Sequence, residues 1–187
     1  FYGSDLTYHG TNPTYYQNTY KLKTNEAVND YSGLIHLIEV LYNSANANFV
    51  CEIQDVFDVD SYLRTLAVEI LIGQWDGYAY NKNNYFLYER PSDGKFIFME
   101  YDLDNTFGID WFNVNWSTRN IYTWANANRP LYSKLLAVPY FKDRFNYHMK
   151  DILTNYFLPS TLLGSLQAKQ NLIANAALLD EYKGYDY

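Results

Sequence analysis

Residues 58–73, DVDSYLRTLAVEILIG, constrain the fold more than any other stretch of the chain. Apolar side chains recur at spacings of three and four from Val59 to Leu71, a pattern that predicts an amphipathic helix. Asp58 stands where a helix N-cap accepts a backbone hydrogen bond, and Gly73 stands where a helix commonly ends. Because the run is so apolar, it predicts a central core helix.

After this helix the apolar pattern changes to strict alternation. The segments NYFLYER (84–90) and KFIFMEYD (95–102) are rich in aromatic residues, which favours strands. The connecting residues PSDG (91–94) place proline early and glycine late, as tight turns do. Together the three segments predict a β-hairpin.

Helical patterns flank this hairpin on both sides. Residues 30–43 have one apolar face, and residues 130–137, 139–157 and 159–183 each begin with a proline, which the first turn of a helix tolerates. Residues 1–29 are polar and turn-rich, so they predict an irregular approach segment. The fold class that follows is α+β, mostly helical, with a small hairpin.

Charge and apolar content exclude several classes of partner. The net charge of −7 over 187 residues argues against nucleic acid, which requires a basic surface. No run of 18 apolar residues occurs, so no membrane span is predicted. The first residues show neither a signal peptide nor an initiator methionine, so we expect a piece of a longer protein. The single Cys51 excludes an internal disulfide, and its apolar neighbours predict a buried thiol.

Two acidic, glycine-marked clusters flank the hairpin. Asp76 and Asn81 lie in WDGYAYNKNN, before its first strand, and Asp102 lies in EYDLDNTFG, at the end of its second. A hairpin brings its two outer ends side by side, so these side chains are expected to converge on one site. Carboxylate and amide oxygens are the ligands that Mg²⁺ prefers.

The spacing of these residues points to a particular chemistry. Protein kinases carry a catalytic aspartate, a metal-binding asparagine five residues later, a hairpin, and then the aspartate of D-F-G. Asp76 and Asn81 have this spacing, and DLDNTFG stands where D-F-G would, with Phe107 and Gly108 displaced by an insertion.

The strings LAVEILIGQWDGYAYNKNNYFLY and GKFIFMEYDLDNTFG together resemble the CotH family of spore-coat, protein-kinase-like proteins. The resemblance covers most of residues 1–187 and implies a single partial domain, the C-terminal lobe of an atypical kinase. It further implies ATP with Mg²⁺ or Mn²⁺ as cofactors, phosphoryl transfer to hydroxyl groups of a coat or surface protein, and a secreted, spore-coat or cell-surface location.

Residue roles follow from the same resemblance. Asp76 is similar to the catalytic aspartate that orients the substrate hydroxyl and accepts its proton. Asn81 is expected to bind the metal, with Asn83 or Asn84 as substitutes if the loop is wound differently.

The second cluster supplies the other candidate metal ligands. Asp102 resembles the D-F-G aspartate because it directly ends the strand FIFMEY. Asp104 is the alternative, and it would otherwise bind a second metal or cap the loop.

The chain departs from a complete kinase in its first part. No G-x-G-x-x-G or V-A-I-K-like string occurs, although a kinase requires a lysine and glutamate pair at the nucleotide phosphates. Lys23 and Glu39 are the available pair. We therefore expect that the nucleotide-binding lobe lies upstream and is missing from this chain, which would be incompletely active alone.

Three alternatives remain. One is a catalytically silent, surface-displayed adhesion module. Its binding platform would be the aromatic segment 109–129, which contains Trp111, Trp116 and Trp124. A glycosidase would use two of the carboxylates but has no use for the asparagines. A structural calcium site outside the EF-hand class is the third. Metal-dependent affinity for ATP separates the kinase from the adhesion module.

Overall fold

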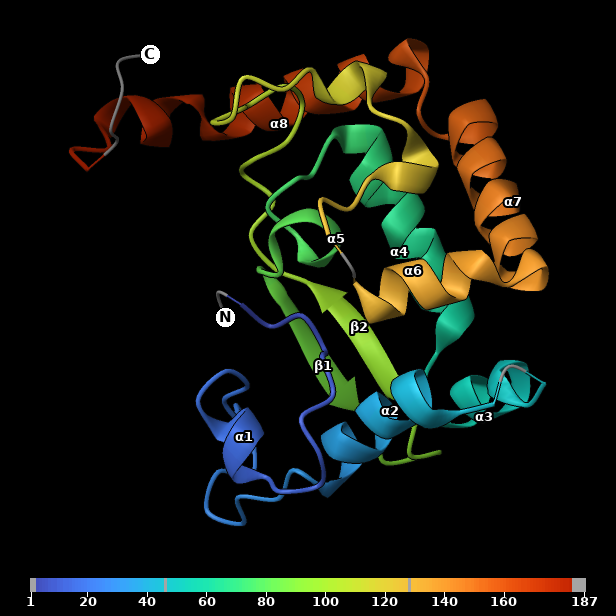
Figure 1. Cartoon of the computed structure of the whole chain (residues 1–187). Helices are drawn as coiled ribbons and strands as arrows, with labels where there is room; N and C mark the ends of the chain where they lie inside the picture. The colour runs from blue at the N-terminus through green and yellow to red at the C-terminus, as the bar shows by residue number, and fades with distance from the viewer. Residues whose placement is uncertain (1–2, 46, 128, 183–187) are drawn as a thin grey trace. The chain divides into compact units, whose positions relative to one another are not determined.

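The computed structural model describes residues 3–45, 47–127 and 129–182, which belong to two units, Phe1–Met149 and Lys150–Tyr187. Among these residues helices predominate over one two-stranded antiparallel sheet, which confirms a mostly helical α+β fold (Figure 1). The elements in chain order are α1 (Thr14–Gln17), α2 (Ser32–Asn43), α3 (Phe49–Val56), α4 (Val59–Ile72), α5 (Tyr78–Asn81), β1 (Tyr85–Glu89), β2 (Phe96–Glu100), the 3-10 turns η1 (Trp116–Thr118) and η2 (Ile121–Thr123), α6 (Pro130–Ala137), α7 (Pro139–Asn155) and α8 (Pro159–Leu179). That the fold corresponds to a kinase C-lobe stays a prediction.

Helix α4 is the central core helix that the sequence predicts. The Asp58 side chain accepts a hydrogen bond from the Ser61 backbone N–H at 3.3 Å, and Gly73 ends the helix in the left-handed region at φ +72°. The helix buries Tyr62, Leu63 and five further residues, Val59, Leu66, Ala67, Glu69 and Ile70. Glu69 is the one charged side chain in that set, and it bears on the site below.

The predicted hairpin is confirmed in position, and the structure defines its register. Tyr85 pairs with Glu100 at its open end, and Glu89 pairs with Phe96 near its turn. Strand β2 contacts α4, and the Asp58 N–H donates to the Phe96 carbonyl at 2.9 Å (Figure 1). The turn end of the hairpin is therefore held against the N-terminal end of α4.

Aromatic rings fill the space between α4 and the hairpin. The Tyr62 ring lies 5.0 Å from that of Phe98, which stacks on Tyr85 at the same distance, and Tyr78 packs edge-on against Tyr85 at 5.3 Å. The Tyr78 hydroxyl also donates to the Asp5 carbonyl and accepts from the Leu131 N–H. Tyrosine thus supplies core volume together with a polar tip that ties distant backbone segments to the core.

The structure differs from the prediction in several short elements. Helices α1, α3 and α5 were not predicted, and α8 ends at Leu179, whereas the predicted helix ran to residue 183, which lies outside the described residues. The prediction of a buried thiol was wrong, because Cys51 is exposed. Helix α3 buries Phe49 and Ile53, which are four residues apart on one face, and Cys51 lies between them on the other face.

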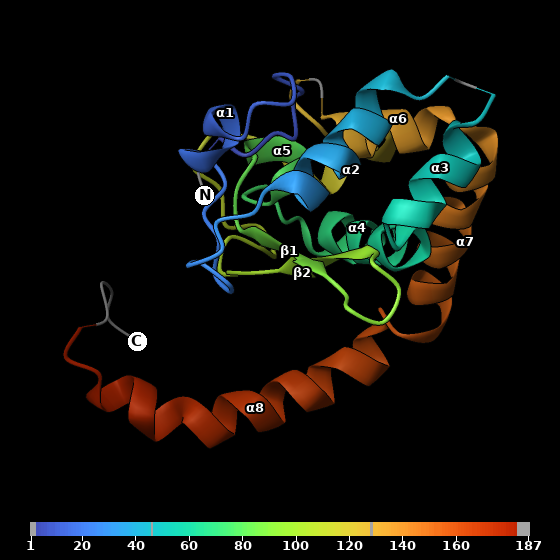
Figure 2. The same ribbon diagram turned by 90° about the horizontal axis from the view of Figure 1, so that it is seen from below.

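Helix α2 contacts both α3 and α6, and these helices lie together in Figure 2. In the second unit, α8 is the main element, and none of its described side chains is buried. Across the described parts of the chain, no helix has the length and apolar character that crossing a membrane requires.

Candidate functional site

Asp76 lies in the loop between α4 and α5, and the residue is only 8 % exposed. Its Oδ1 accepts a short hydrogen bond from Asn81 Nδ2, and its Oδ2 accepts from Asn84 Nδ2 at 3.0 Å and Asn105 Nδ2 at 3.4 Å. Three neutral amides therefore surround one carboxylate. They orient the carboxylate without neutralising it, so it can still accept a proton or face a cation.

The short helix α5 explains the five-residue spacing. Its single turn is closed by the Asn81 N–H donating to the Gly77 carbonyl at 3.0 Å, which returns Asn81 to the side of Asp76. Lys82 and Asn84 then take positive φ values of +59° and +51° before β1 begins. Asparagine tolerates this region better than most residues, so Asn84 suits both the backbone and the hydrogen bond.

Gln74 joins the two acidic loops. The side chain is 1 % exposed, its Oε1 accepts from the Asp76 N–H at 3.1 Å, and its Nε2 donates to the Asp102 carbonyl at 2.9 Å. The Phe107 N–H also donates to the Ile72 carbonyl at 2.7 Å. The two acidic loops therefore meet, as the hairpin predicts, and the hydrogen bonds that join them involve backbone groups and one buried side-chain amide.

The two remaining predicted acids are exposed. Asp102 follows β2 with a φ of +56°, in the left-handed region that aspartate and asparagine adopt more readily than most residues. Asp104 Oδ1 accepts from Asn105 Nδ2 at 2.9 Å, and the same nitrogen donates to Asp76. Asn105 therefore links Asp104 to Asp76 directly.

A cation bound at this site would have few carboxylate ligands. Within the described residues, no three or more His, Cys, Asp or Glu side chains are grouped so as to hold a metal ion. Mg²⁺ is usually held by one or two carboxylates together with substrate phosphates, and the residues present fit that pattern. The Asn81 and Asn84 amides donate to Asp76 through nitrogen, which leaves their oxygens as the groups able to face a cation.

A second pair of carboxylates lies beside this site and is buried. Glu69 of α4 is 3 % exposed, and none of the four side-chain oxygens of Glu69 and Glu100 has a hydrogen-bond partner among the described residues. Burial raises the pKa of both carboxyl groups, and the nearby charge of Glu100 raises that of Glu69 further. Glu69 also presses on the Asp76 loop, because a Cβ at Gly77 would stand 2.4 Å from its Oε1.

Gly77→Ala is therefore expected to destabilise the chain by about 1–3 kcal/mol, the usual cost of forcing an extra carbon into a filled space. Urea unfolding followed by circular dichroism measures the change. Gly164→Ala, in a helix with open space around the new Cβ, is the control and should be neutral or slightly stabilising. Equal stability of Gly77→Ala and the wild type would contradict the packing of Glu69 against this loop.

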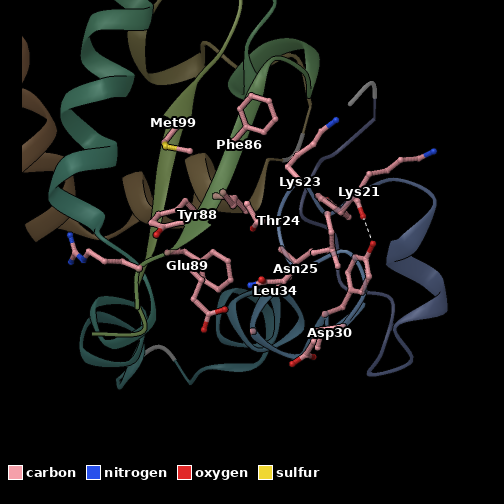
Figure 3. A pocket seen from close by; sticks show the side chains of 18 of the residues that line it. Lys21, Lys23, Thr24, Asn25, Asp30, Leu34, Phe86, Tyr88, Glu89 and Met99 are labelled. Carbon is pink, nitrogen blue, oxygen red and sulfur yellow. Dashed lines mark hydrogen bonds between the residues drawn. The ribbon is translucent and has the colours of Figure 1, made fainter. Parts of the chain in front are cut away.

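A pocket of about 870 Å³ runs along the hairpin, within the size range of small-molecule sites. Residues 20–25 line one side, and β1 residues with Met99 line the other; Lys23 and Phe86 are both in the lining (Figure 3). The Phe86 ring contacts that of Tyr101 at 5.2 Å, the residue before Asp102. One end of the pocket therefore adjoins the acidic loop.

Some of the predicted site residues lie close to Asp76 in the structure, and for the others a shared site stays a prediction. Asn81 donates a hydrogen bond to Asp76, as does Asn84, one of its two predicted substitutes. Asp104 is linked to Asp76 through the Asn105 amide. Whether Asn81, Asn83 or Asn84 binds a metal stays a prediction. Lys23 lines the pocket, whereas Glu39 is outside that lining and accepts from the Tyr8 hydroxyl at 3.2 Å.

Sequence reasoning missed Gln74, Asn105, Glu69 and Glu100. For Asn105 the signal was present, since DLDN adds an amide to the acidic cluster. A glutamate within the buried face of an apolar helix was the signal for Glu69. No sequence signal marked Gln74 or Glu100, because their roles depend on which loops meet in three dimensions.

The aromatic segment after Asp104 is partly core and partly surface. Trp75, Trp116 and Trp124 are buried, whereas Trp111 is 70 % exposed. Arg119 lies over the Tyr80 ring at 5.0 Å and donates to the Trp124 carbonyl, so it is held within this segment.

A mostly helical fold whose hairpin holds an amide-bound aspartate beside a second acidic loop defines the structural class of this chain. Within that class, the chain belongs to the CotH family: the family model described as CotH kinase protein matches residues 2–187.

Named relatives come from a fungus and a bacterium. Invasin CotH3 of Rhizopus delemar is 33 % identical over 115 residues, which cover 58 % of this chain and 18 % of the invasin. Inner spore coat protein H of Bacillus subtilis is 26 % identical over 167 residues, covering 89 % of this chain and 44 % of that protein. Spore coat protein homolog 1 of Rhizopus delemar is 25 % identical over 179 residues, covering 92 % of this chain and 28 % of the relative. The chain thus spans less than half the length of each of these relatives.

Proposed function

We propose that the protein to which this chain belongs transfers the γ-phosphate of ATP to hydroxyl groups of a protein substrate with Mg²⁺ or Mn²⁺. The observation that carries the proposal is the Asp76 carboxylate, held by Asn81 and Asn84 at the open end of the hairpin that leads into Asp102. A kinase requires this order of parts, and membership in a family described as CotH kinase protein supports it.

Asp76 would orient the acceptor hydroxyl and take its proton. Its two oxygens already accept from side-chain amides, which limits rotation of the carboxylate and directs its remaining lone pairs. Catalysis of phosphoryl transfer depends mainly on such positioning and on electrostatic stabilisation. The low exposure of Asp76 strengthens both effects.

Asn81, Asp102 and Asp104 are the residues that would hold the metal. When bound, the metal neutralises charge on the phosphates of the nucleotide. The Gln74 side chain holds the Asp102 carbonyl and the Asp76 N–H in fixed relation, so it would keep the metal-binding and hydroxyl-orienting groups in register.

The pocket along the hairpin is the proposed place of the nucleotide. Phe86 and Met99 offer apolar surface to a base, and Lys23 is in the same lining and would meet phosphate charge (Figure 3). The names of the relatives support a coat or surface protein as the substrate and a spore-coat or cell-surface location for this protein.

Calorimetric titration of ATP, with and without Mg²⁺ or Mn²⁺, tests this function. We expect metal-dependent binding by the chain extended upstream, loss of that binding in Asp102→Ala, and no loss in Asp55→Ala, an exposed aspartate on α3. If ATP binds the extended chain equally well with and without metal, or not at all, the kinase proposal fails.

A surface-displayed binding module is the second candidate. One observation favours it: Leu103, Phe107, Ile109, Trp111 and Phe112 are all at least 45 % exposed and lie within one loop. Contiguous exposed apolar surface commonly marks an interaction site, and three of the relatives carry the name invasin, at 31–34 % identity. The same titration separates the two functions, because an adhesion module has no need for metal-dependent ATP affinity.

A further inference from the structure

Asn105 is a buried amide in the second acidic loop, and the proposed function gives it no role of its own. The residue is only 4 % exposed, although Asp104 before it and Phe107 after it in the loop are exposed. A buried side-chain amide requires hydrogen-bond partners within the protein. Asn105 finds two carboxylates, because its Nδ2 donates to Asp104 Oδ1 at 2.9 Å and to Asp76 Oδ2 at 3.4 Å. One NH₂ group therefore contacts a carboxylate from each acidic loop.

The backbone of this loop is held by other groups. The Thr106 hydroxyl donates to the Leu103 carbonyl at 2.9 Å, and the Phe107 N–H donates to the Ile72 carbonyl at 2.7 Å. These bonds tie the loop to itself and to the end of α4 without the Asn105 side chain. We therefore expect that the Asn105 amide serves the two carboxylates and that the loop keeps its path without it.

Two carboxylates in one site repel each other, and a shared donor reduces that repulsion. Ionised carboxylates only accept hydrogen bonds, whereas the amide NH₂ group has two N–H bonds, one for each carboxylate. Hydrogen bonds to charged groups are the stronger kind, and the burial of Asn105 and Asp76 limits their replacement by water. Since Asp104 Oδ1 accepts from Asn105, its Oδ2 is the oxygen left to face a cation.

We propose that Asn105 is a positioning residue for phosphoryl transfer, because its NH₂ group fixes the metal-facing Asp104 relative to the hydroxyl-orienting Asp76. This inference rests on the proposed function. In this role Asn105 needs no contact with substrate or metal, since it acts through two side-chain carboxylates. Gln74 acts differently, because it joins backbone groups of the two loops. A carboxylate at position 105 would add a third negative charge, and an apolar side chain would offer no donor, so the position requires an amide.

Asn105→Leu, which is similar in size and has no donor, tests the inference in the chain extended upstream. We expect kcat for phosphoryl transfer to fall by about 10–10²-fold, as the loss of hydrogen bonds to charged groups predicts. The Mn²⁺ concentration for half-maximal transfer should rise, because Asp104 is no longer held, whereas KM for ATP at saturating Mn²⁺ should stay near the wild-type value. Calorimetric titration of Mn²⁺ in the presence of a non-hydrolysable ATP analogue measures metal affinity without turnover, and it should show weaker binding by Asn105→Leu.

Thr106→Val is the matched control. Thr106 is buried beside Asn105, and valine keeps its shape while removing the hydroxyl that donates to the Leu103 carbonyl. A purely structural role of the loop predicts similar losses of kcat in both variants, whereas positioning of the carboxylates predicts a loss in Asn105→Leu alone. If circular dichroism shows that Asn105→Leu does not fold, Asn105→Ser replaces it, since serine has a single donor and places no apolar group beside the carboxylates.

An active wild type with unchanged kcat and Mn²⁺ requirement in the Asn105 variant would overturn this inference and leave the proposed function standing. Equal loss of kcat in the Asn105 variant and Thr106→Val would do the same, because the order of the loop alone would then matter. A wild type that transfers no phosphate overturns the proposed function instead. The Mn²⁺ titration then decides on Asn105 by itself: weaker binding by its variant than by the wild type and Thr106→Val supports its hold on Asp104, and equal binding rejects it.

Discussion

Asp76→Asn is expected to lower phosphoryl transfer by about 10²–10⁴-fold, the usual contribution of a positioned general base. Asparagine preserves the size of the side chain but removes the charge and half of the accepting capacity. Asn81 and Asn84 would then face an amide, and one of their N–H groups would meet another N–H. Transfer of labelled phosphate from ATP to a protein substrate measures the change in the chain extended upstream.

The variant must be shown to fold and to bind nucleotide. We expect Asp76→Asn to keep most of its metal-dependent ATP affinity, because Asp102 and the pocket are unchanged, and Asp55→Asn to keep full transfer. An Asp76→Asn protein that transfers phosphate as fast as the wild type would remove Asp76 from the catalytic role and leave the binding module as the better reading.

The parts of the site that sequence could predict are those set by local pattern. The apolar period of α4 and the alternation in the hairpin fixed which loops would meet, because a hairpin must bring Asn84 and Tyr101 together. The structure shows this directly, with the Tyr101 N–H donating to the Asn84 carbonyl at 3.1 Å. The asparagine five residues after Asp76 was predicted from the spacing found in kinases, whereas the single turn of α5 that returns it to Asp76 was not predicted.

The rest depends on contacts between segments far apart in sequence. Gln74 is polar and stands just after a helix, where exposure is the ordinary outcome, yet it is buried because two loop backbones need its amide. Glu100 continues the alternation of β2 without any sign that Glu69 faces it. The pocket was also unpredictable, because one of its walls comes from residues 20–25, which have no regular structure.

Exposure of the tryptophans was likewise undetermined by sequence. Trp111 and Trp116 stand in similar aromatic and polar surroundings. Trp116 is buried because its indole N–H donates to Asp110 Oδ1 at 2.8 Å and its ring stacks on Trp75 at 6.1 Å. Asp110 is thereby used for structure, and its pKa is lowered by hydrogen bonds from backbone N–H groups and Trp116, against the opposing effect of burial.

Trp75→Ala is expected to destabilise the chain by about 3–5 kcal/mol, the cost of removing a large buried ring. The side chain is 1 % exposed, and its ring contacts those of Trp111, Phe112 and Trp116 at 4.9–6.1 Å. Its indole N–H also donates to the Ile109 carbonyl at 2.8 Å, so the loop after Asp104 would lose its main support. Urea unfolding and near-ultraviolet circular dichroism measure the two effects.

Trp111→Ala is the matched control, because Trp111 touches the same cluster from the solvent side and is 70 % exposed. It should cost about 1 kcal/mol or less. The comparison also separates the two candidate functions, since a kinase that needs its loop ordered should lose transfer in Trp75→Ala and retain it in Trp111→Ala. A binding module that uses the exposed ring should lose ligand in Trp111→Ala while its stability stays near that of the wild type. Equal destabilisation by both substitutions would show that Trp75 does not support the loop in the way its contacts indicate.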